Sequence, residues 1–255
     1  MALLRCDFFS DVLEVGTSMT VLLPQASEEQ IGVVSTAATG DVPVLYLLHG
    51  LSDDSTAWLR YTNIERYAAQ LGLAVVMPQV QRSFYADEAH GGRYWMFLSE
   101  ELPSVVGSFF NVSERREDTF VAGLSMGGYG ALKWALHQPE RFAAAASLSG
   151  ALDLVALSHT SDRGALFERV FDGPVGAHDD LFALLAGADV ETLPWFYVGC
   201  GTEDELYESS VRFVDEATAA GLDVHVDFRP GEHVWDLWET VIRDVLGWLP
   251  LRSGG

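Results

Sequence analysis

The chain contains very little lysine and cysteine and has a large deficit of positive charge. Lys133 is the only lysine among 255 residues, and 37 acidic residues against 15 basic ones give a formal net charge of −22. A field of this sign repels polyanions, so nucleic acids and anionic membranes are not expected partners. The two cysteines, Cys6 and Cys200, form neither a disulfide framework nor a metal-binding pattern.

Long apolar runs are also missing. No segment approaches the ~20 apolar residues that a membrane span needs, and the N-terminal sequence MALLRCD lacks the apolar core of a signal peptide. These absences predict a cytoplasmic protein. No pair of histidines has metal-ligand spacing on one predicted element, and no glycine-rich loop of the dinucleotide-binding type occurs. The sequence therefore predicts neither a metal ion nor a cofactor.

The residues that are present suit a single α/β domain over 1–255 with a sizeable core, because 49% of them are hydrophobic. An antiparallel pair of strands is predicted over 5–24, followed by a connecting loop over 25–42. Buried strands are then predicted over 44–48, 73–77, 119–124, 142–148, 192–200 and 223–228, alternating with helices over 62–71, 100–111, 129–137, 207–220 and 232–249. This alternation predicts a central, mostly parallel sheet with helices on both faces.

Two segments interrupt this alternation. Residues 79–97 form a predicted loop that is rich in aromatic side chains. Residues 151–191 contain short amphipathic pieces separated by turns, and we interpret them as an insertion, or small cap, over the edge of the sheet. Neither segment has the composition of an interdomain linker, so we expect no domain boundary there.

Residues 119–130, TFVAGLSMGGYG, carry the most chemical information. An apolar, strand-like run leads to Ser125, glycines follow at once, and a helical pattern begins at Tyr129. A strand, a sharp turn and a helix around Gly123-x-Ser125-x-Gly127 are the signature of a nucleophile elbow. In so tight a turn, a Cβ at either glycine would collide with neighbouring backbone. Ser125 is therefore the predicted nucleophile.

A serine hydroxyl needs a base, and the base needs a carboxylate that orients it. In this arrangement both follow later strands, in the chain order serine, acid, histidine. His233 comes after the last predicted strand and is the candidate base, while Asp204 comes after the strand before it and is the candidate acid. Glu203, the neighbour of Asp204, remains a rival for the role of the acid, and Asp153 is a weaker one.

The tetrahedral intermediate of such a reaction carries an oxyanion, which needs fixed hydrogen-bond donors. One predicted donor is the backbone N–H of Met126, directly after the serine. The other is the N–H of Leu51, in the loop after an early central strand, where Gly50 lets the backbone approach a substrate closely. Trp58 and Trp235 lie on or beside the predicted site loops and are candidates for the substrate pocket, with core packing as the alternative for Trp235.

Four separated stretches are informative together. They read VPVLYLLHGLSDDSTAWL, TFVAGLSMGGYGALKWAL with SLSGALD after it, CGTEDELYE, and GEHVWDLWE. In this order they resemble the esterase D family of α/β-hydrolases, and most of all its bacterial tributyrin esterases, from about Cys6 to Leu249. The resemblance implies the α/β-hydrolase fold and a serine-histidine-aspartate enzyme without a cofactor. It carries over to the residues named above as triad and oxyanion donors: Ser125, Asp204, His233, Leu51 and Met126.

The resemblance implies a serine carboxylesterase that hydrolyses small-molecule esters with short acyl chains through an acyl-enzyme on Ser125. S-formylglutathione hydrolases and mycolyltransferases resemble the chain more distantly, so a thioesterase or an acyltransferase with the same triad is the alternative. A non-catalytic binding module is disfavoured, because the chain keeps every triad member and both elbow glycines. Segments 79–97 and 151–191 depart most from the family pattern and are predicted to shape the pocket. The sequence leaves open whether the protein forms a homo-oligomer.

Overall fold

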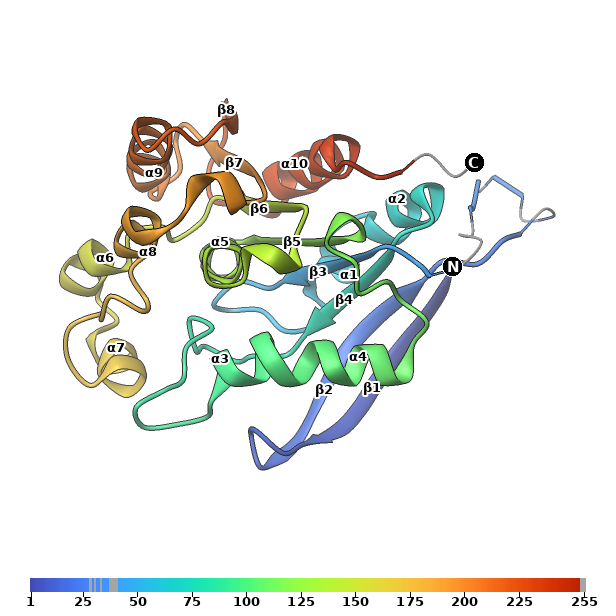
Figure 1. Cartoon of the computed structure of the whole chain (residues 1–255), viewed down its shortest axis with the longest axis horizontal. Helices are drawn as coiled ribbons and strands as arrows, with labels where there is room; N and C mark the ends of the chain where they lie inside the picture. The colour runs from blue at the N-terminus through green and yellow to red at the C-terminus, as the bar shows by residue number, and fades with distance from the viewer. Residues whose placement is uncertain (28, 30, 33, 37–40, 253–255) are drawn as a thin grey trace.

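The computed structural model describes residues 1–27, 29, 31–32, 34–36 and 41–252, and these form an eight-stranded sheet flanked by helices (Figure 1). The strands are β1 (Ala2–Ser10), β2 (Val15–Leu23), β3 (Val44–Leu48), β4 (Ala74–Pro78), β5 (Thr119–Leu124), β6 (Ala144–Leu148), β7 (Trp195–Gly201) and β8 (Val224–Arg229). Across the sheet they follow the order β1-β2-β4-β3-β5-β6-β7-β8. β2 is antiparallel to β1 and β4, and the pairs from β4 to β8 are parallel. The predicted mostly parallel sheet is thus confirmed.

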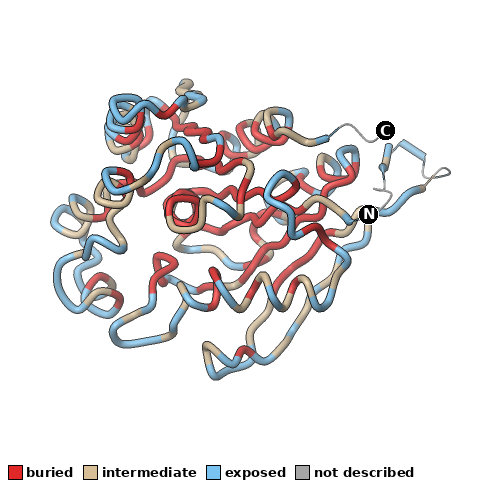
Figure 2. Tube along the Cα trace, in the orientation of Figure 1, coloured by how far each residue is buried: buried red, intermediate tan, exposed pale blue. Residues whose placement is uncertain are grey.

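The central strands bury side chains on both faces of the sheet, as their continuous apolar sequences predict. In β3, Val44, Tyr46 and Leu48 belong to one core cluster, whereas Leu45 and Leu47 belong to another. This division follows from the strand geometry, because successive side chains point to opposite faces. Figure 2 shows the central strands buried along their length. The sheet therefore separates two cores, and each core requires its own cover of helices.

The helices cover the two faces in two groups. Side chains of α5 (Met126–His137), α9 (Tyr207–Ala219) and α4 (Leu102–Phe109) enter the first core. Side chains of α1 (Ala57–Tyr61), α2 (Ile64–Leu71) and α10 (Trp235–Trp248) enter the second. Among the described residues, no helix has both the length and the apolar character needed to cross a bilayer. The prediction of helices on both faces is confirmed.

The helix predicted over 100–111 begins well before its expected start, and the helix α1 was not predicted. The helix expected over 100–111 begins at Tyr94, inside the segment expected to be a loop, because α3 (Tyr94–Met96) and the π-helical turn η1 (Phe97–Glu101) run directly into α4. A π turn breaks the 3.6-residue period, so a search for that period does not detect the start of this helix. The short helix α1 has too few residues to show a period.

Several other boundaries also differ by two or three residues, and those of α5 and β7 have a clear physical reason. α5 begins at Met126, not at Tyr129, because its glycines pack tightly against neighbouring strands instead of ending the helix. β7 begins at Trp195, not at Thr192, and the preceding Pro194 has no N–H for the strand ladder. Part of the loop predicted over 25–42, including Gly40, lies outside the described residues.

The three amphipathic pieces predicted in segment 151–191 form the helices α6 (Leu154–Thr160), α7 (Gly164–Phe171) and α8 (Leu181–Gly187). They connect β6 to β7 and gather at one side of the molecule, on the left of Figure 1. Buried leucine and valine side chains attach this group to the first core. The role of the segment as a cap remains a prediction.

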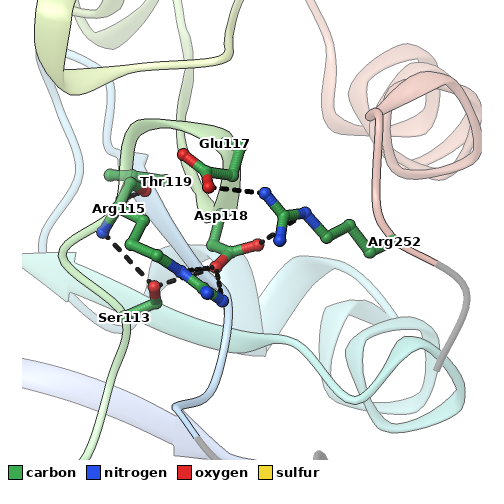
Figure 3. Close-up of polar contacts among 6 residues, drawn as sticks. All are labelled: Ser113, Arg115, Glu117, Asp118, Thr119 and Arg252. Carbon is green, nitrogen blue, oxygen red and sulfur yellow. Dashed lines mark hydrogen bonds and ion pairs between the residues drawn. The ribbon is translucent and has the colours of Figure 1, made fainter. Parts of the chain in front are cut away.

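The strand that leads to Ser125 is anchored at its start by the side chain of Asp118 (Figure 3). Its buried carboxylate accepts hydrogen bonds from the Ser113 hydroxyl at 2.9 Å and from the Arg115 guanidinium at 2.8 Å. Arg252, after the last helix, approaches the same carboxylate and pairs with Glu117. Charge-assisted hydrogen bonds of this kind hold the beginning of β5 to segments on either side of it.

Candidate active site

Ser125 stands between β5 and α5 in a strained backbone conformation, with φ 53° and ψ −118°. The turn leaves no room for side chains at its glycines. A Cβ on Gly123 would lie 2.3 Å from the carbonyl oxygen of Gly127, and a Cβ on Gly127 would lie 2.4 Å from the carbonyl oxygen of Leu48. The predicted steric reason for both glycines is therefore confirmed, and such strain is a feature of functional sites.

His233 connects Ser125 to Asp204, although the three residues come from different loops. Its Nδ1 lies 2.8 Å from a carboxylate oxygen of Asp204, and its Nε2 lies 3.1 Å from the Ser125 hydroxyl oxygen. Because an ionised carboxylate only accepts hydrogen bonds, Nδ1 must be the donor to Asp204, and in the neutral ring Nε2 is then an acceptor. The structure thus brings together the serine, the base and the acid that the sequence predicts.

The Asp204 side chain is fully buried and stays ionised. Its burial by itself raises the pKa of the carboxyl, but the hydrogen bond from His233 and a further one from the Leu206 N–H, at 2.9 Å, outweigh that effect. The net result is a pKa below the ordinary range. A carboxylate that is ionised at neutral pH beside Nδ1 favours the tautomer that carries its proton on Nδ1 and leaves Nε2 as an acceptor.

The two rival acids are engaged elsewhere. Glu203 is exposed, and its carboxylate accepts hydrogen bonds from the Gly231 N–H and the Thr202 hydroxyl. Asp153 caps α6 by accepting the Ala156 N–H at 2.9 Å and pairs with an arginine of α9. Neither carboxylate is hydrogen-bonded to His233, so Asp204 is the one candidate acid of the three that contacts this imidazole.

A cavity of about 350 Å³ opens over the serine. Ser125 and His233 line it, together with both predicted oxyanion donors, Leu51 and Met126, and with Gly50. Gly50 is packed closely: a Cβ there would lie 2.7 Å from both a carboxylate oxygen of Asp53 and a side-chain carbon of Leu124. Neither predicted donor N–H is hydrogen-bonded to another described residue. Both amides are therefore free to bind an oxyanion in this cavity.

The two tryptophans predicted for the pocket have different positions. Trp235 lines the cavity, whereas Trp58 does not. Trp58 is buried in the second core, donates its indole N–H to the Leu48 carbonyl at 3.1 Å, and contacts Trp235 edge-on. The expectation for Trp58 is corrected accordingly, because its hydrogen bond holds it beneath the wall of the cavity. Trp238, also in the lining, packs edge-on against the imidazole of His233.

Four charged residues of the cavity lining were not predicted: Asp53, Arg82, Arg163 and Glu205. Arg82 and Arg163 come from segments 79–97 and 151–191, which were expected to shape the pocket. Asp53 and Glu205 lie within the informative stretches that also contain Leu51 and Asp204. Arg82 and Arg163 lie outside those stretches, so the sequence offers no signal that distinguishes them from ordinary surface charges. Within the described residues, no three histidine, cysteine or acidic side chains are grouped as the ligands of a metal ion would be.

The sequence model of the family described as "Putative esterase" matches residues 10–249. The chain belongs to this esterase family. An acetyl esterase from Caldicellulosiruptor saccharolyticus is 29% identical, and the alignment covers 98% of each protein. The diacylglycerol acyltransferase/mycolyltransferase Ag85B of Mycobacterium avium is 31% identical over 84% of this chain and 77% of the relative.

Two solved structures from Staphylococcus aureus are similar over 98% of both chains. The substrate-bound fluorophosphonate-binding serine hydrolase F is 32% identical, with a TM-score of 0.88. The apoenzyme of the S-formylglutathione hydrolase FrmB is 32% identical, with a TM-score of 0.85. With the family match, these likenesses confirm the α/β-hydrolase fold and a serine hydrolase of carboxylic esters. The esterase D and tributyrin assignments remain predictions.

In this esterase, buried His49 makes stability depend on pH. Burial lowers the pKa of its imidazole to about 4, although its contact with the Gly50 carbonyl and the charge of Asp54 both raise it. The unfolded chain binds that proton near pH 6.5. Between pH 6.5 and 4 the unfolded state therefore holds more protons, and stability decreases as the pH falls. When the pH falls from 7 to 5, the unfolding free energy of the parent should decrease. In His49→Asn we expect that decrease to be smaller by about 2 kcal/mol.

Urea unfolding at the two pH values measures this difference. The exposed His159 provides the matched control, because His159→Asn removes an imidazole that the fold does not enclose. It should leave the pH dependence of the parent unchanged. Equal losses of free energy in the parent and in His49→Asn would contradict the prediction.

Proposed function

We propose that this esterase hydrolyses small-molecule esters with short acyl chains through an acyl-enzyme on Ser125. The observation that carries the proposal is the continuous chain of contacts from Asp204 through His233 to Ser125, which ends in the cavity. A hydroxyl with an imidazole nitrogen 3.1 Å away can be deprotonated as it attacks a carbonyl carbon.

The proposed reaction has two matching halves. His233 Nε2 takes the proton of Ser125 as its oxygen attacks the ester carbonyl, and the N–H groups of Leu51 and Met126 bind the resulting oxyanion. His233 then gives the proton to the leaving alcohol, which leaves an acyl group on Ser125. Water then attacks the acyl carbon as His233 takes its proton, and the same donors bind the second oxyanion. Breaking the bond to the serine oxygen releases the carboxylic acid, and His233 returns the proton to Ser125.

The size and lining of the cavity support a short acyl group. About 350 Å³ lies at the lower end of the range for small-molecule sites. Phe84, Trp235 and Trp238 contribute aromatic walls, and the acetyl esterase relative fits a small acyl group. A thioesterase is the second candidate, because the S-formylglutathione hydrolase of similar structure covers 98% of the chain. An acyltransferase is the third, on the likeness to the mycolyltransferase.

A panel of p-nitrophenyl esters with acyl chains of two, four and eight carbons tests the proposal. We expect kcat/KM for the acetate or butyrate to exceed that for the octanoate by at least about tenfold, because methylenes that do not fit a pocket cost about 1–3 kcal/mol each. A preference for the octanoate would contradict the short-chain assignment. Faster turnover of S-formylglutathione than of p-nitrophenyl acetate would favour the thioesterase, and transfer to an added alcohol instead of water would favour the acyltransferase.

A further inference from the structure

Two buried side chains that do not line the cavity hold the loop that carries Leu51. The Nδ1 of His49 lies 2.7 Å from the carbonyl oxygen of Gly50, and the hydroxyl of Tyr85 donates to the carbonyl oxygen of His49 at 2.9 Å. His49 is 1% exposed and Tyr85 is fully buried. Two consecutive peptide groups of the loop are therefore each held by a side chain that does not line the cavity.

A third contact settles which way the His49 imidazole donates. The Val80 N–H donates to Nε2 of His49 at 3.2 Å, so Nε2 is an acceptor. The ring is neutral, and its one proton is on Nδ1, where it is donated to the Gly50 carbonyl. The imidazole is thus fixed at both nitrogens, between the loop after β3 and the segment after β4.

The planarity of the peptide bond links this hydrogen bond to the oxyanion donor. The carbonyl of Gly50 and the N–H of Leu51 belong to the same trans peptide unit, in which they point in opposite directions. Holding the carbonyl toward His49 therefore directs the Leu51 N–H to the opposite side. Because Leu51 lines the cavity beside Ser125, that N–H is available to the substrate.

Tyr85 is itself held by contacts with α5, the helix that begins directly after Ser125. It has a left-handed backbone, with φ 51°, and its carbonyl accepts a hydrogen bond from Lys133 of α5 at 2.9 Å. Its ring packs onto Gly130 of the same helix, where a Cβ would lie 2.5 Å from a ring carbon. Met126, the other predicted donor, is the first residue of α5. One helix therefore supports both halves of the oxyanion site.

We propose that His49 and Tyr85 are positioning residues that aim the Leu51 N–H at the oxyanion of the transition state. The proposal rests on the proposed function, because it assigns a role within that reaction. A donor held in place before the reaction needs no reorganisation as charge develops on the carbonyl oxygen. Loss of either side chain should therefore weaken transition-state binding more than binding of the ester.

Three variants test this role: Tyr85→Phe, His49→Leu and His49→Asn. Tyr85→Phe should lower kcat about tenfold and His49→Leu on the order of 100-fold, both with KM little changed, since complete loss of a donor costs about 10²–10³ in kcat. His49→Asn should recover part of the loss, because its amide can still donate to the Gly50 carbonyl. Titration of active sites with a fluorophosphonate corrects each kcat for the fraction of folded enzyme.

A trifluoromethyl ketone supplies a readout that a purely structural role would not change. The serine oxygen adds to the ketone carbon, its proton passes to His233, and the hemiketal oxyanion occupies the site of the donors. The affinity for this ketone should fall in proportion to kcat across the three variants. Tyr129→Phe is the matched control, because it removes a buried hydroxyl that donates to the Asp179 carbonyl at 2.7 Å, away from the loop.

The outcomes separate the inference from the proposed function. If Tyr85→Phe and Tyr129→Phe lower the melting temperature equally and both keep the parent's kcat and ketone affinity, the positioning role is wrong while the esterase assignment stands. An unmodified chain that neither turns over esters nor reacts with the fluorophosphonate overturns both. The inference is supported if kcat and ketone affinity fall together in Tyr85→Phe and in His49→Leu but not in Tyr129→Phe.

Discussion

Ser125→Ala is expected to lower kcat for p-nitrophenyl butyrate by roughly a million-fold, the scale of loss when the nucleophile of such a triad is removed. Without the hydroxyl, no acyl-enzyme forms, and His233 has no proton to take. The cavity and both donor amides remain, so some acceleration over the reaction in water should persist. Steady-state kinetics of the purified variant measure the loss, and labelling by a fluorophosphonate should disappear with it.

The cavity offers a matched control for this variant. Ser52 is a second serine in the lining, but it is exposed and has no contact with His233. Ser52→Ala removes the same atom from the same cavity and should leave kcat within about threefold, as surface substitutions usually do. The assignment of the nucleophile would be refuted if Ser125→Ala kept the kcat of the parent. It would also be refuted if Ser52→Ala lowered kcat as much as Ser125→Ala does.

Lys133→Met is expected to destabilise the protein by about 3–5 kcal/mol, the cost of leaving a buried charge without its partner. The Lys133 ammonium is 0% exposed, donates to the Asp179 carboxylate at 2.6 Å, and lies 4.5 Å from the centre of the Trp95 ring. Burial lowers the pKa of this ammonium, and Asp179 acts in the opposite direction. Methionine preserves much of the shape of lysine, so the loss isolates the charge and its hydrogen bonds.

Urea unfolding measures this cost, and two further variants interpret it. Asp179→Asn in the Lys133→Met background should recover at least about 1 kcal/mol, because it removes the carboxylate that was left without a partner. Arg5→Met breaks the exposed pair with Asp7 and should change stability by no more than about 0.5 kcal/mol. A Lys133→Met cost as small as that of Arg5→Met would show that the buried pair does not stabilise the fold.

Much of the candidate site could be predicted because its residues lie in local sequence patterns that have a known structural cause. Gly123 and Gly127 flank Ser125 for a steric reason that depends only on a tight turn between a strand and a helix, and the structure has the predicted collisions. The central strands were recognisable because burial on both faces demands continuous apolar sequence. The order of acid and base followed from the places of Asp204 and His233 after consecutive strands.

Other features could not be predicted from local patterns, and most of these depend on contacts that form only in the folded chain. Trp58 was expected at the pocket, but a hydrogen bond to Leu48 holds it in the core. The charged residues Arg82 and Arg163 line the cavity although they lie far from Ser125 in the chain. The helix that begins at Tyr94 has a different, local reason: the π turn interrupts the period that would indicate its start.

Local sequence patterns are enough to predict the strand, turn and helix around Ser125, the alternating α/β architecture, and the two loops that carry Asp204 and His233. They left Glu203 beside Asp204 as a rival, because neighbouring side chains of a loop point in different directions and only the folded loop decides which one reaches His233. The tertiary structure also decided the role of the single lysine. Its partners, Asp179 and the Tyr85 carbonyl, lie 46 and 48 residues away in the chain. A buried charge is tolerable only where the surrounding segments supply its partners. Because these partners are distant in the chain, only the folded structure shows that Lys133 can be buried.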